Sequence, residues 1–167
     1  YVGYILDDVK RLEGTVTDIE DYVNYTKIHR PKFALTNLRS VLDEAIAHKF
    51  ENQTCSTIKV IIKFKTSETE VFADHSYLVE AMEHLLQNAC EAMVAGGLLT
   101  IEVSSNPQYM IIDVIDTGRG IPADDLNEIF NPFYTTKVRG AGVGLSKVYL
   151  IVEEHGGMVP RTMEALN

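Results

Sequence analysis

Two glycine-rich turns enclose the part of the sequence that is best suited to bind a charged ligand. The first covers residues 116–121 (DTGRGI) and the second covers residues 140–145 (GAGVGL), with a predicted loop and one short helix between them. Glycine permits positive φ angles and close approach of a ligand to the backbone. Successive N–H groups in such turns also form anion-binding nests. The spacing therefore predicts a lid over a phosphate-bearing ligand, in preference to an ordinary surface loop.

The predicted lid also carries the positive charge that such a ligand needs. The net charge of −9 argues against a general nucleic-acid binder and disfavours any polyanion unless cations gather locally. Arg119, Lys137 and Arg139 supply those cations. We expect Lys137 and Arg139 to neutralise a terminal phosphate. The Walker pattern Gly-x-x-x-x-Gly-Lys-Ser/Thr is absent, so the phosphates are not bound by a P-loop.

Asp116 combines a carboxylate with the end of a predicted strand. Residues 109–115 are a strongly β-branched run, which is typical of a central buried strand, and Asp116 follows directly. An ionised carboxylate only accepts hydrogen bonds. It therefore suits a base with an exocyclic amino group, such as adenine, better than it suits a phosphate.

Asn88 lies inside a predicted helix over residues 75–95. His84 precedes it by four residues and Glu91 follows it by three, so all three side chains can share one face. Mg²⁺ usually takes one or two protein oxygens together with substrate phosphates and water. Asn88 thus offers an oxygen to Mg²⁺, or else it satisfies backbone groups between helix and sheet. The residue pattern leaves both interpretations open.

Hydrophobic periodicity predicts the elements that must position these residues. We expect strands over residues 32–35, 57–65, 70–73, 98–104 and 109–115, and helices over residues 36–48, 75–95 and 143–155. Asp74 is a predicted helix cap, and Gly142 and Gly144 fall at the N-terminus of the last helix, where phosphate is favoured. The element order predicts an α/β two-layer sandwich, with helices on one face of a mixed sheet.

The composition is that of a globular protein with room for one ordinary domain and an appendage. The 167 residues are 46% hydrophobic and 23% charged. No apolar run approaches the roughly 20 residues that span a bilayer, and no signal peptide is recognisable. Cys55 and Cys90 are too few for a disulfide framework or a zinc site. We expect Cys90 to be a small core residue in a reducing, cytoplasmic setting. Because the sequence begins at Tyr1, we expect it to be a piece of a longer protein.

Residues 1–28 carry a heptad seam. Its apolar members are spaced alternately by four and three residues: Ile5, Val9, Leu12, Val16, Ile19 and Val23. This pattern is typical of a coiled coil or a helical bundle, and it indicates a helix roughly 40 Å long. A narrow seam favours pairing with another helix over packing on the same domain. Pro31 marks the end of the helix.

Four segments resemble the sequence boxes of sensor histidine kinases, in the GHKL superfamily of ATPases and kinases. They are residues 84–92 (HLLQNACEA, N box), 116–121 (G1 box), 129–137 (IFNPFYTTK, F box) and 140–145 (G2 box). The order and spacing of four boxes are highly specific, and the resemblance covers about residues 33–159. Residues 1–30 resemble the second helix of the family's dimerisation and phosphotransfer hairpin. Residues 31–167 would then be the catalytic ATP-binding domain, of the Bergerat-type fold.

The resemblance implies roles for individual residues, with ATP and Mg²⁺ as ligands. Asn88 would bind Mg²⁺ and act with His84 and Lys137 in catalysis, and Asp116 would bind the adenine amino group. The full implied ATP-binding set is Asn88, Glu91, Asp116, Gly118, Gly120, Ile121, Phe130, Thr136, Lys137, Arg139, Gly140, Gly142, Val143, Gly144 and Leu145.

Three departures from the family pattern affect these expectations. None of the five histidines lies in the setting of the family's phosphoacceptor, so the acceptor is expected outside this sequence. Gyrase-like ATPases carry Glu at the position of His84, so His84 argues against efficient hydrolysis. The usual strand after Gly157 meets Pro160, which disfavours a central strand, so the final strand is expected to be altered or missing.

The resemblance implies a protein-histidine kinase of a two-component system. It would donate the γ-phosphate of Mg-ATP to a histidine, for relay to an aspartate of a response-regulator receiver domain. The parent would be a homodimer through the seam helix, with this portion on the cytoplasmic side of a sensor that a membrane segment elsewhere could anchor. The alternatives are an ATPase that couples ATP binding to conformational change, or a non-catalytic nucleotide-binding dimerisation module.

Overall fold

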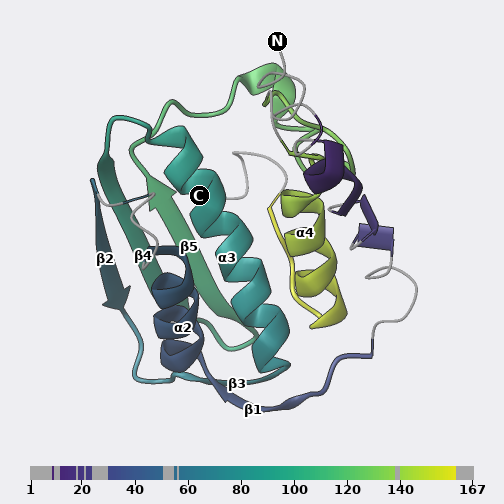
Figure 1. The fold of residues 1–167 in the computed structure, drawn as a ribbon. Coiled ribbons are helices and arrows are strands. Elements are labelled where there is room, and N and C mark those ends of the chain that lie inside the picture. Colours follow the sequence, from purple (N-terminus) through teal and green to yellow (C-terminus); the bar gives the residue numbers. More distant parts are fainter. Residues whose placement is uncertain are drawn as a thin grey trace.

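A computed structural model describes residues 30–50, 55, 57–137 and 140–160, together with residues 9, 12–17, 19, 20, 22 and 23. Figure 1 shows the arrangement of the elements. Their bounds are β1 Ala34–Asn37, α2 Leu38–Phe50, β2 Ile58–Phe64, β3 Glu70–Ala73, α3 His75–Ala92, β4 Gly97–Ser105, β5 Met110–Asp116, a 3₁₀ turn Ala123–Asp125 and α4 Gly144–Glu154.

The main sheet is mixed and has the described strand order β2-β4-β5. Strand β2 runs parallel to β4, starting with Ile58 beside Gly97, and β4 runs antiparallel to β5. A parallel pair needs a long crossover connection, and here β3 and α3 form it. Strands β1 and β3 make a separate antiparallel pair. The predicted mixed sheet is therefore confirmed.

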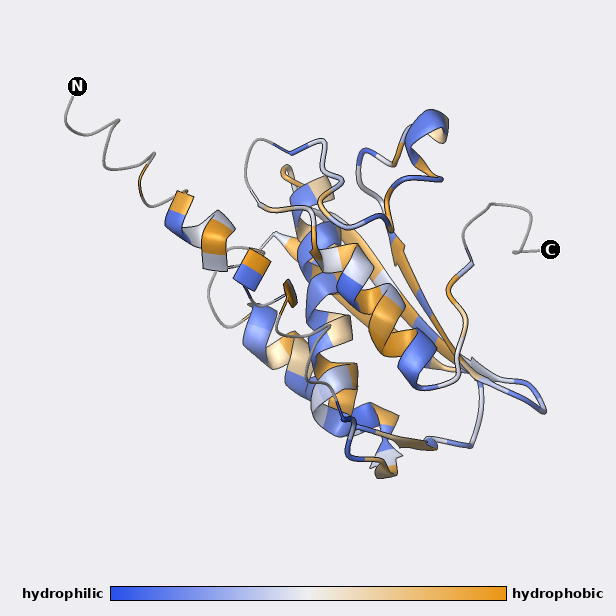
Figure 2. Cartoon of the chain, turned by 90° about the vertical axis from the view of Figure 1, so that its right-hand side faces the viewer, coloured by the Kyte–Doolittle hydropathy of each residue, from blue (hydrophilic) through white to orange (hydrophobic). Residues whose placement is uncertain are grey.

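Helices α2 and α3 lie over one face of the main sheet, and α4 lies beside α3 (Figure 1). The apolar sides of α2 and α3 and the inward side chains of β4 form the main core, in which Leu42, Leu86 and Ile101 are fully buried. Helix α4 packs on α3 through a second, smaller cluster. Figure 2 shows that the strands of the main sheet are largely hydrophobic, whereas the helices are banded with hydrophilic and hydrophobic residues. This is the pattern of helices with one buried side, and the predicted two-layer α/β fold is confirmed.

Side chains cap the N-termini of α2 and α3, and the predicted cap at Asp74 is confirmed. Asp74 begins α3 by accepting the backbone N–H of Tyr77 at 3.3 Å, and Asn37 begins α2 by accepting the N–H of Arg39 at 2.9 Å. Helix α3 ends at Ala92, three residues before its predicted end, and Gly96 then takes a φ of +87°. These caps satisfy N–H groups that a helix leaves unpaired.

Strand β5 differs from its prediction as a central buried strand. Among the described strands β4 is central and β5 lies at the edge. Ile111 and Ile115 are 37% and 50% exposed, and Asp116 at the strand end is exposed as well. A β-branched run indicates strand preference but does not say how many neighbours the strand has.

Part of the predicted seam helix lies outside the described residues, including Ile5. The described residues 12–17, 19, 20, 22 and 23 are helical. The seam residues Val9, Leu12 and Val16 are 45%, 62% and 52% exposed. Tyr22 packs edge-on against Phe133 of the lid, with ring centroids 5.6 Å apart. Every helix in the described part of the chain is too short or too polar to span a bilayer.

Cys55 and Cys90 form a disulfide, with their Cα atoms 5.9 Å apart. The expectation that Cys90 is an unpaired core residue is therefore wrong. The parallel register of β2 and β4 brings the turn before β2 next to the last turn of α3, where Cys90 lies. The two cysteines are 35 residues apart and lie in different elements, so no local sequence pattern indicated their contact.

Reduction of this disulfide is expected to destabilise the domain. Closing a loop of 35 residues restricts the unfolded chain, which typically stabilises the folded state by roughly 2–4 kcal/mol. Urea unfolding with and without dithiothreitol measures the difference, and the double variant Cys55→Ser/Cys90→Ser should not respond to the reductant. Equal unfolding midpoints for oxidised and fully reduced wild type would contradict the expectation.

Candidate functional site

The lid is joined to α3 by the side chain of Lys137. Its Nζ donates a hydrogen bond to Asn88 Oδ1 at 2.6 Å and forms an ion pair with the carboxylate of Glu91. Asn88 and Glu91 lie three residues apart on α3, so they present their oxygens on one face. The structure thus brings together two residues of the N box and one of the F box, all of which were predicted site residues.

Glu91 is held as a carboxylate by its neighbours. Burial alone would raise the pKa of Glu91, but hydrogen bonds from Gln87 and Lys137, with the charge of Lys137, outweigh this and hold the pKa below its usual value. Gln87 Nε2 donates to Glu91 Oε1 at 2.7 Å. Because the pKa is lowered, the carboxylate keeps its charge at neutral pH and loses it only in acid.

The first glycine turn packs against the C-terminal end of the same helix. The N–H of Arg119 donates to the carbonyl of Ala92 at 3.2 Å. A Cβ at Gly118 would lie 2.6 Å from Cβ of Ala92 and 2.8 Å from Oδ1 of Asp116, so this position requires glycine. Close packing therefore holds the Asp116 turn against the end of α3, one helical turn beyond Asn88.

Asp116 organises the turn with one oxygen of its carboxylate. Its Oδ1 accepts the N–H of Gly118 at 2.8 Å. The following hydroxyl, Thr117 Oγ1, accepts the N–H of Leu98 at 3.0 Å and so ties the turn to β4. Asp116 itself is exposed, which corrects the expectation of a buried strand end, and its carboxylate can meet a ligand from solvent.

The second glycine turn fits closely into the lid. Gly142 has a φ of +71°, and a Cβ there would lie 2.5 Å from the carbonyl oxygen of Tyr134. The carbonyl of Gly142 accepts the N–H of Phe133 at 3.0 Å. Phe133 has a φ of +68° and is the only non-glycine residue among the described ones with a positive φ. The turn and the F box are therefore built as one unit.

His84 lies where this unit enters α4. Its Nδ1 would be 3.4 Å from a Cβ at Gly144, the first residue of α4. Its Nε2 is buried and has no hydrogen-bond partner among the described residues; Glu80 Oε1 is 3.7 Å away. Lys147 donates to the same Glu80 oxygen at 3.2 Å. The pKa of Glu80 lies below its usual value because His84, and then Lys147, face its carboxylate.

Aromatic residues of the F box pack within the lid and against α4, and no contact with the Asn88 side chain is described for them. Phe130 packs against Tyr149 of α4, with ring centroids 6.1 Å apart. The hydroxyl of Tyr134 donates to Asp125 Oδ1 at 2.6 Å. The first contact joins the lid to α4 and the second joins two parts of the lid, so Phe130 has a structural role here.

The remaining predicted site residues fall into two groups. Val143 and Leu145 flank the start of α4 at the second glycine turn, with Gly140 before them. Three others are exposed, and no contact with the polar face of α3 is described for them: Gly120, Ile121 and Thr136. Arg139 lies outside the described residues.

Sequence reasoning missed three contributors to the site. Gln87 lies four residues before Glu91 on a helix, a spacing that predicts their contact. Ala92 contributes its carbonyl and its small size to the first glycine turn. Glu80 connects α3 to Lys147 of α4, and only the tertiary packing reveals that pair.

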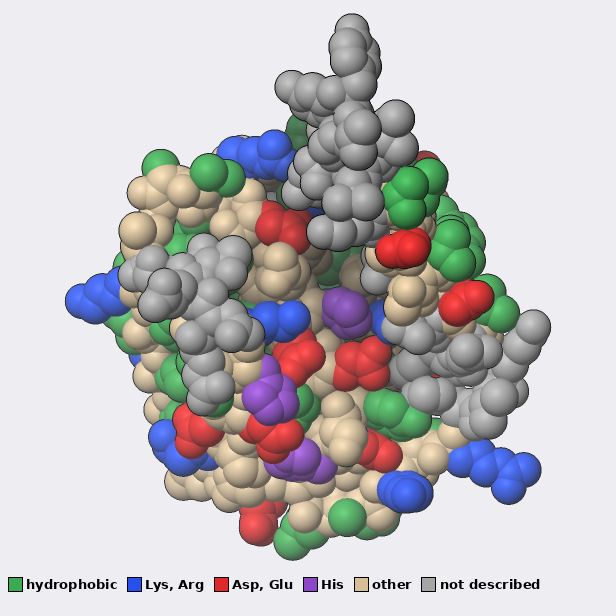
Figure 3. Space-filling model, in the orientation of Figure 1, with side chains coloured by type: hydrophobic (Ala, Val, Ile, Leu, Met, Phe, Trp, Pro, Cys, Tyr) green, Lys and Arg blue, Asp and Glu red, His purple; other side chains and the backbone are tan. Residues whose placement is uncertain are grey.

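Charged groups cross the helical layer from one helix to the next. Figure 3 shows acidic, basic and histidine side chains gathered at the middle of this face. The described pairs are His48–Glu83 at 2.6 Å and Glu44–His75 at 2.9 Å between α2 and α3, and Glu80–Lys147 at 3.2 Å between α3 and α4. The polar face of α3 is thus a continuous surface, of which the Asn88–Glu91 pair is one part. No group of three or more His, Cys, Asp or Glu side chains suited to a metal occurs within the described ranges.

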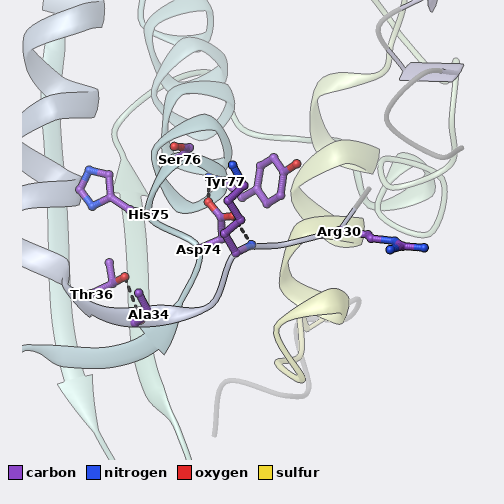
Figure 4. A pocket seen from close by; sticks show the side chains of 8 residues that line it. Arg30, Ala34, Thr36, Asp74, His75, Ser76 and Tyr77 are labelled. Carbon is purple, nitrogen blue, oxygen red and sulfur yellow. Dashed lines mark hydrogen bonds between the residues drawn. The ribbon is translucent and has the colours of Figure 1, made fainter. Parts of the chain in front are cut away.

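A cavity of about 310 Å³ lies away from this site, beside the N-terminus of α3. Figure 4 shows hydrogen bonds at Thr36 and Asp74, and it shows that Arg30 points away from the other side chains. Asp74 accepts the N–H of Lys32 at 2.6 Å, and the N–H of Asp74 donates to His155 Nε2 at 2.9 Å. Thr36 donates to the carbonyl of Ala73 at 2.9 Å. These bonds hold β1 to the cap of α3, so Thr36 and Asp74 have structural partners here.

Residues 73–165 match the family described as "Histidine kinase-, DNA gyrase B-, and HSP90-like ATPase". The chain belongs to this family. The match begins at the end of β3 and includes α3, both glycine turns and α4, which are the elements that build the site.

The similar curated proteins are kinases. Sensor histidine kinase ZraS of Escherichia coli O157:H7 is 30% identical over 154 residues, which are 91% of this chain and 32% of ZraS. Sporulation kinase C of Bacillus subtilis (strain 168) is 28% identical over 166 residues, 99% of this chain and 38% of that protein. The chain therefore spans about a third of the length of these relatives.

Solved structures show the same fold. The catalytic domain of histidine kinase ThkA aligns with a TM-score of 0.67 at 28% identity, covering 74% of this chain and 82% of that one. ThkA in complex with the response regulator protein TrrA aligns with a TM-score of 0.75 at 26% identity, covering 94% and 44%. The expected ATP-binding domain of the sensor histidine kinase type is confirmed.

Gly142→Ala is expected to destabilise the lid more than the same substitution at a glycine that has a similar positive φ but open space around it. A non-glycine residue at positive φ costs roughly 1–2 kcal/mol, and at Gly142 the new Cβ would also collide with Tyr134. Gly156→Ala is the matched control, because Gly156 has a φ of +70° and no atom lies within 4 Å of the place that its Cβ would take. Hydrogen exchange at Phe133, whose N–H binds Gly142, measures the effect; equal exchange in the two variants would contradict it.

Proposed function

We propose that this domain binds Mg-ATP between α3 and the lid and donates the γ-phosphate to a histidine. The observation that carries the proposal is the contact of Lys137 with Asn88 and Glu91. It places a lid cation beside two oxygens on the helix that also abuts the Asp116 turn. Charge for phosphates, oxygens for a metal and a carboxylate for a base thus lie along one helix.

The donor set fits Mg²⁺. Asn88 Oδ1 and the Glu91 carboxylate are hard oxygen ligands, and Mg²⁺ usually takes one or two such groups with substrate phosphates and water completing its shell. Asn88 would hold the ion. When bound, the ion would neutralise charge that develops on the phosphates. Lys137 would then neutralise the terminal phosphate, and the uncapped N–H groups at the start of α4 would bind the phosphates of the same ligand.

Asp116 would select the base. Its Oδ1 is used by the N–H of Gly118, so the second oxygen is the one suited to accept the adenine amino group. We therefore expect the site to prefer ATP over GTP, because guanine carries a carbonyl oxygen at the position where adenine carries that amino group. An unpaired carboxylate facing an oxygen would be unfavourable.

The phosphoacceptor and the partners belong to the parent protein. None of the histidines in this sequence lies in the family's acceptor setting, so the acceptor would come from another segment. The complex of ThkA with the response regulator TrrA supports a response-regulator receiver domain as the next acceptor. The exposed seam residues support a homodimer through that helix. We place this portion on the cytoplasmic side, where ATP is present.

Asp116→Asn is expected to weaken ATP and ADP binding strongly while keeping the turn. Asparagine retains Oδ1 for the N–H of Gly118, but its amide nitrogen would face the adenine amino group. The loss is roughly 100-fold in affinity, from one charge-assisted hydrogen bond and one unpaired donor. Asn88→Ala should instead abolish the Mg²⁺ dependence and spare adenosine recognition. Calorimetric titration with and without Mg²⁺ measures both, and unchanged affinity in Asp116→Asn would refute the adenine assignment.

Incubation with γ-labelled ATP is expected to leave this chain unlabelled. Adding the segment of the parent protein that carries the family-type acceptor histidine should give acid-labile label on that segment, because phosphohistidine hydrolyses in acid. An Asn88→Ala domain in the same mixture is the control and should give none. Label on this chain alone would show that one of its own histidines is an acceptor.

A further inference from the structure

The ammonium of Lys137 occupies the cation position of the site. Its Nζ lies 2.6 Å from Asn88 Oδ1 and is paired with Glu91 Oε2. Gln87 binds the other Glu91 oxygen at 2.7 Å, so the carboxylate is oriented toward the lysine. The two oxygens that face the lid therefore converge on one positive charge.

An ammonium group and a small divalent cation bind the same kinds of partner. Each prefers anionic or carbonyl oxygens, and neither accepts hydrogen bonds. Two positive charges a few ångströms apart repel each other strongly near a protein surface. Lys137 and a divalent ion therefore cannot share Asn88 and Glu91 favourably.

We propose that Asn88 and Glu91 form a cation site that Lys137 fills when no nucleotide is bound and that a divalent ion takes over on binding. Glu91 is thereby assigned as a second oxygen of the site, beside Asn88. Lys137 is a tethered counter-ion of the helix, and it leaves this site as the ion enters. The inference rests on the proposed function for the identity of the ligand, but not for the competition itself.

The exchange gives Lys137 two successive partners. Without nucleotide, the lysine neutralises Glu91 and holds the end of the F box against α3. With Mg-ATP, the ion neutralises Glu91 and the released ammonium is available to the terminal phosphate. The positive charge that the phosphate needs is therefore withheld until the metal arrives, so that phosphate binding by Lys137 depends on the metal.

The test measures Mn²⁺ binding to the nucleotide-free protein by electron paramagnetic resonance, with Mn²⁺ as the probe in place of Mg²⁺. Lys137→Met should bind Mn²⁺ about tenfold more tightly than wild type, because a competing charge is gone. Lys137→Arg keeps the charge and should remain as weak as wild type. Lys137→Met/Glu91→Gln should lose the gain, because Glu91 supplies the anionic oxygen.

Lys65→Met is the matched control. Lys65 also pairs with a glutamate, Glu102, but does so on the sheet, so its removal should leave Mn²⁺ affinity unchanged. Circular dichroism checks that each variant is folded, and Lys137→Gln replaces Lys137→Met if the latter is not. Equal Mn²⁺ affinity in wild type and the neutral variant would overturn the inference, as would an undiminished gain in the double variant.

Nucleotide titration of the same samples separates the two proposals. Absence of ATP and ADP binding in every sample would refute the proposed function, whereas the Mn²⁺ comparison is made without nucleotide and is decided on its own. If nucleotide binds and Lys137→Met also gains Mn²⁺ affinity, both are supported.

Discussion

Helix α3 must satisfy two different surfaces at once. Its buried side, with Val79, Met82 and Leu86, packs into the core against the main sheet. Its other side carries the Asn88 and Glu91 oxygens that the lid contacts. Because a helix is rigid over this length, the core fixes where the polar residues stand. The candidate site therefore depends on the packing of a helix whose buried residues never touch a ligand.

The lid is attached to this helix at successive levels. Arg119 binds the carbonyl of Ala92 at one end, Lys137 binds Asn88 one turn earlier, and Gly144 approaches His84 another turn earlier. These contacts come from the first glycine turn, the F box and the second glycine turn in that order. The three segments thus contact α3 in their sequence order, from the C-terminal end of the helix toward its N-terminus.

The sequence predicted what depends on local pattern and missed what depends on register. Apolar spacing and the cap at Asp74 located α3 within a few residues, because periodicity and capping are local properties. The edge position of β5 was missed because strand composition does not report neighbours. The disulfide and the Lys137–Asn88 contact join positions 35 and 49 residues apart, and only the parallel pairing and the lid path bring them together. The roles implied for Asn88 and Asp116 came from the family resemblance and remain predictions.

The parallel pairing of β2 with β4 has a consequence for the rate of folding. Ile58 and Gly97 start that pairing from the two ends of a crossover that includes β3 and α3. Bringing such ends together costs loop-closure entropy before any contact forms, which makes non-local pairing slow. Cys55 and Cys90 close a loop of 35 residues around the same crossover. In the oxidised chain the unfolded ensemble already holds both strand starts near each other, so this pairing becomes effectively local.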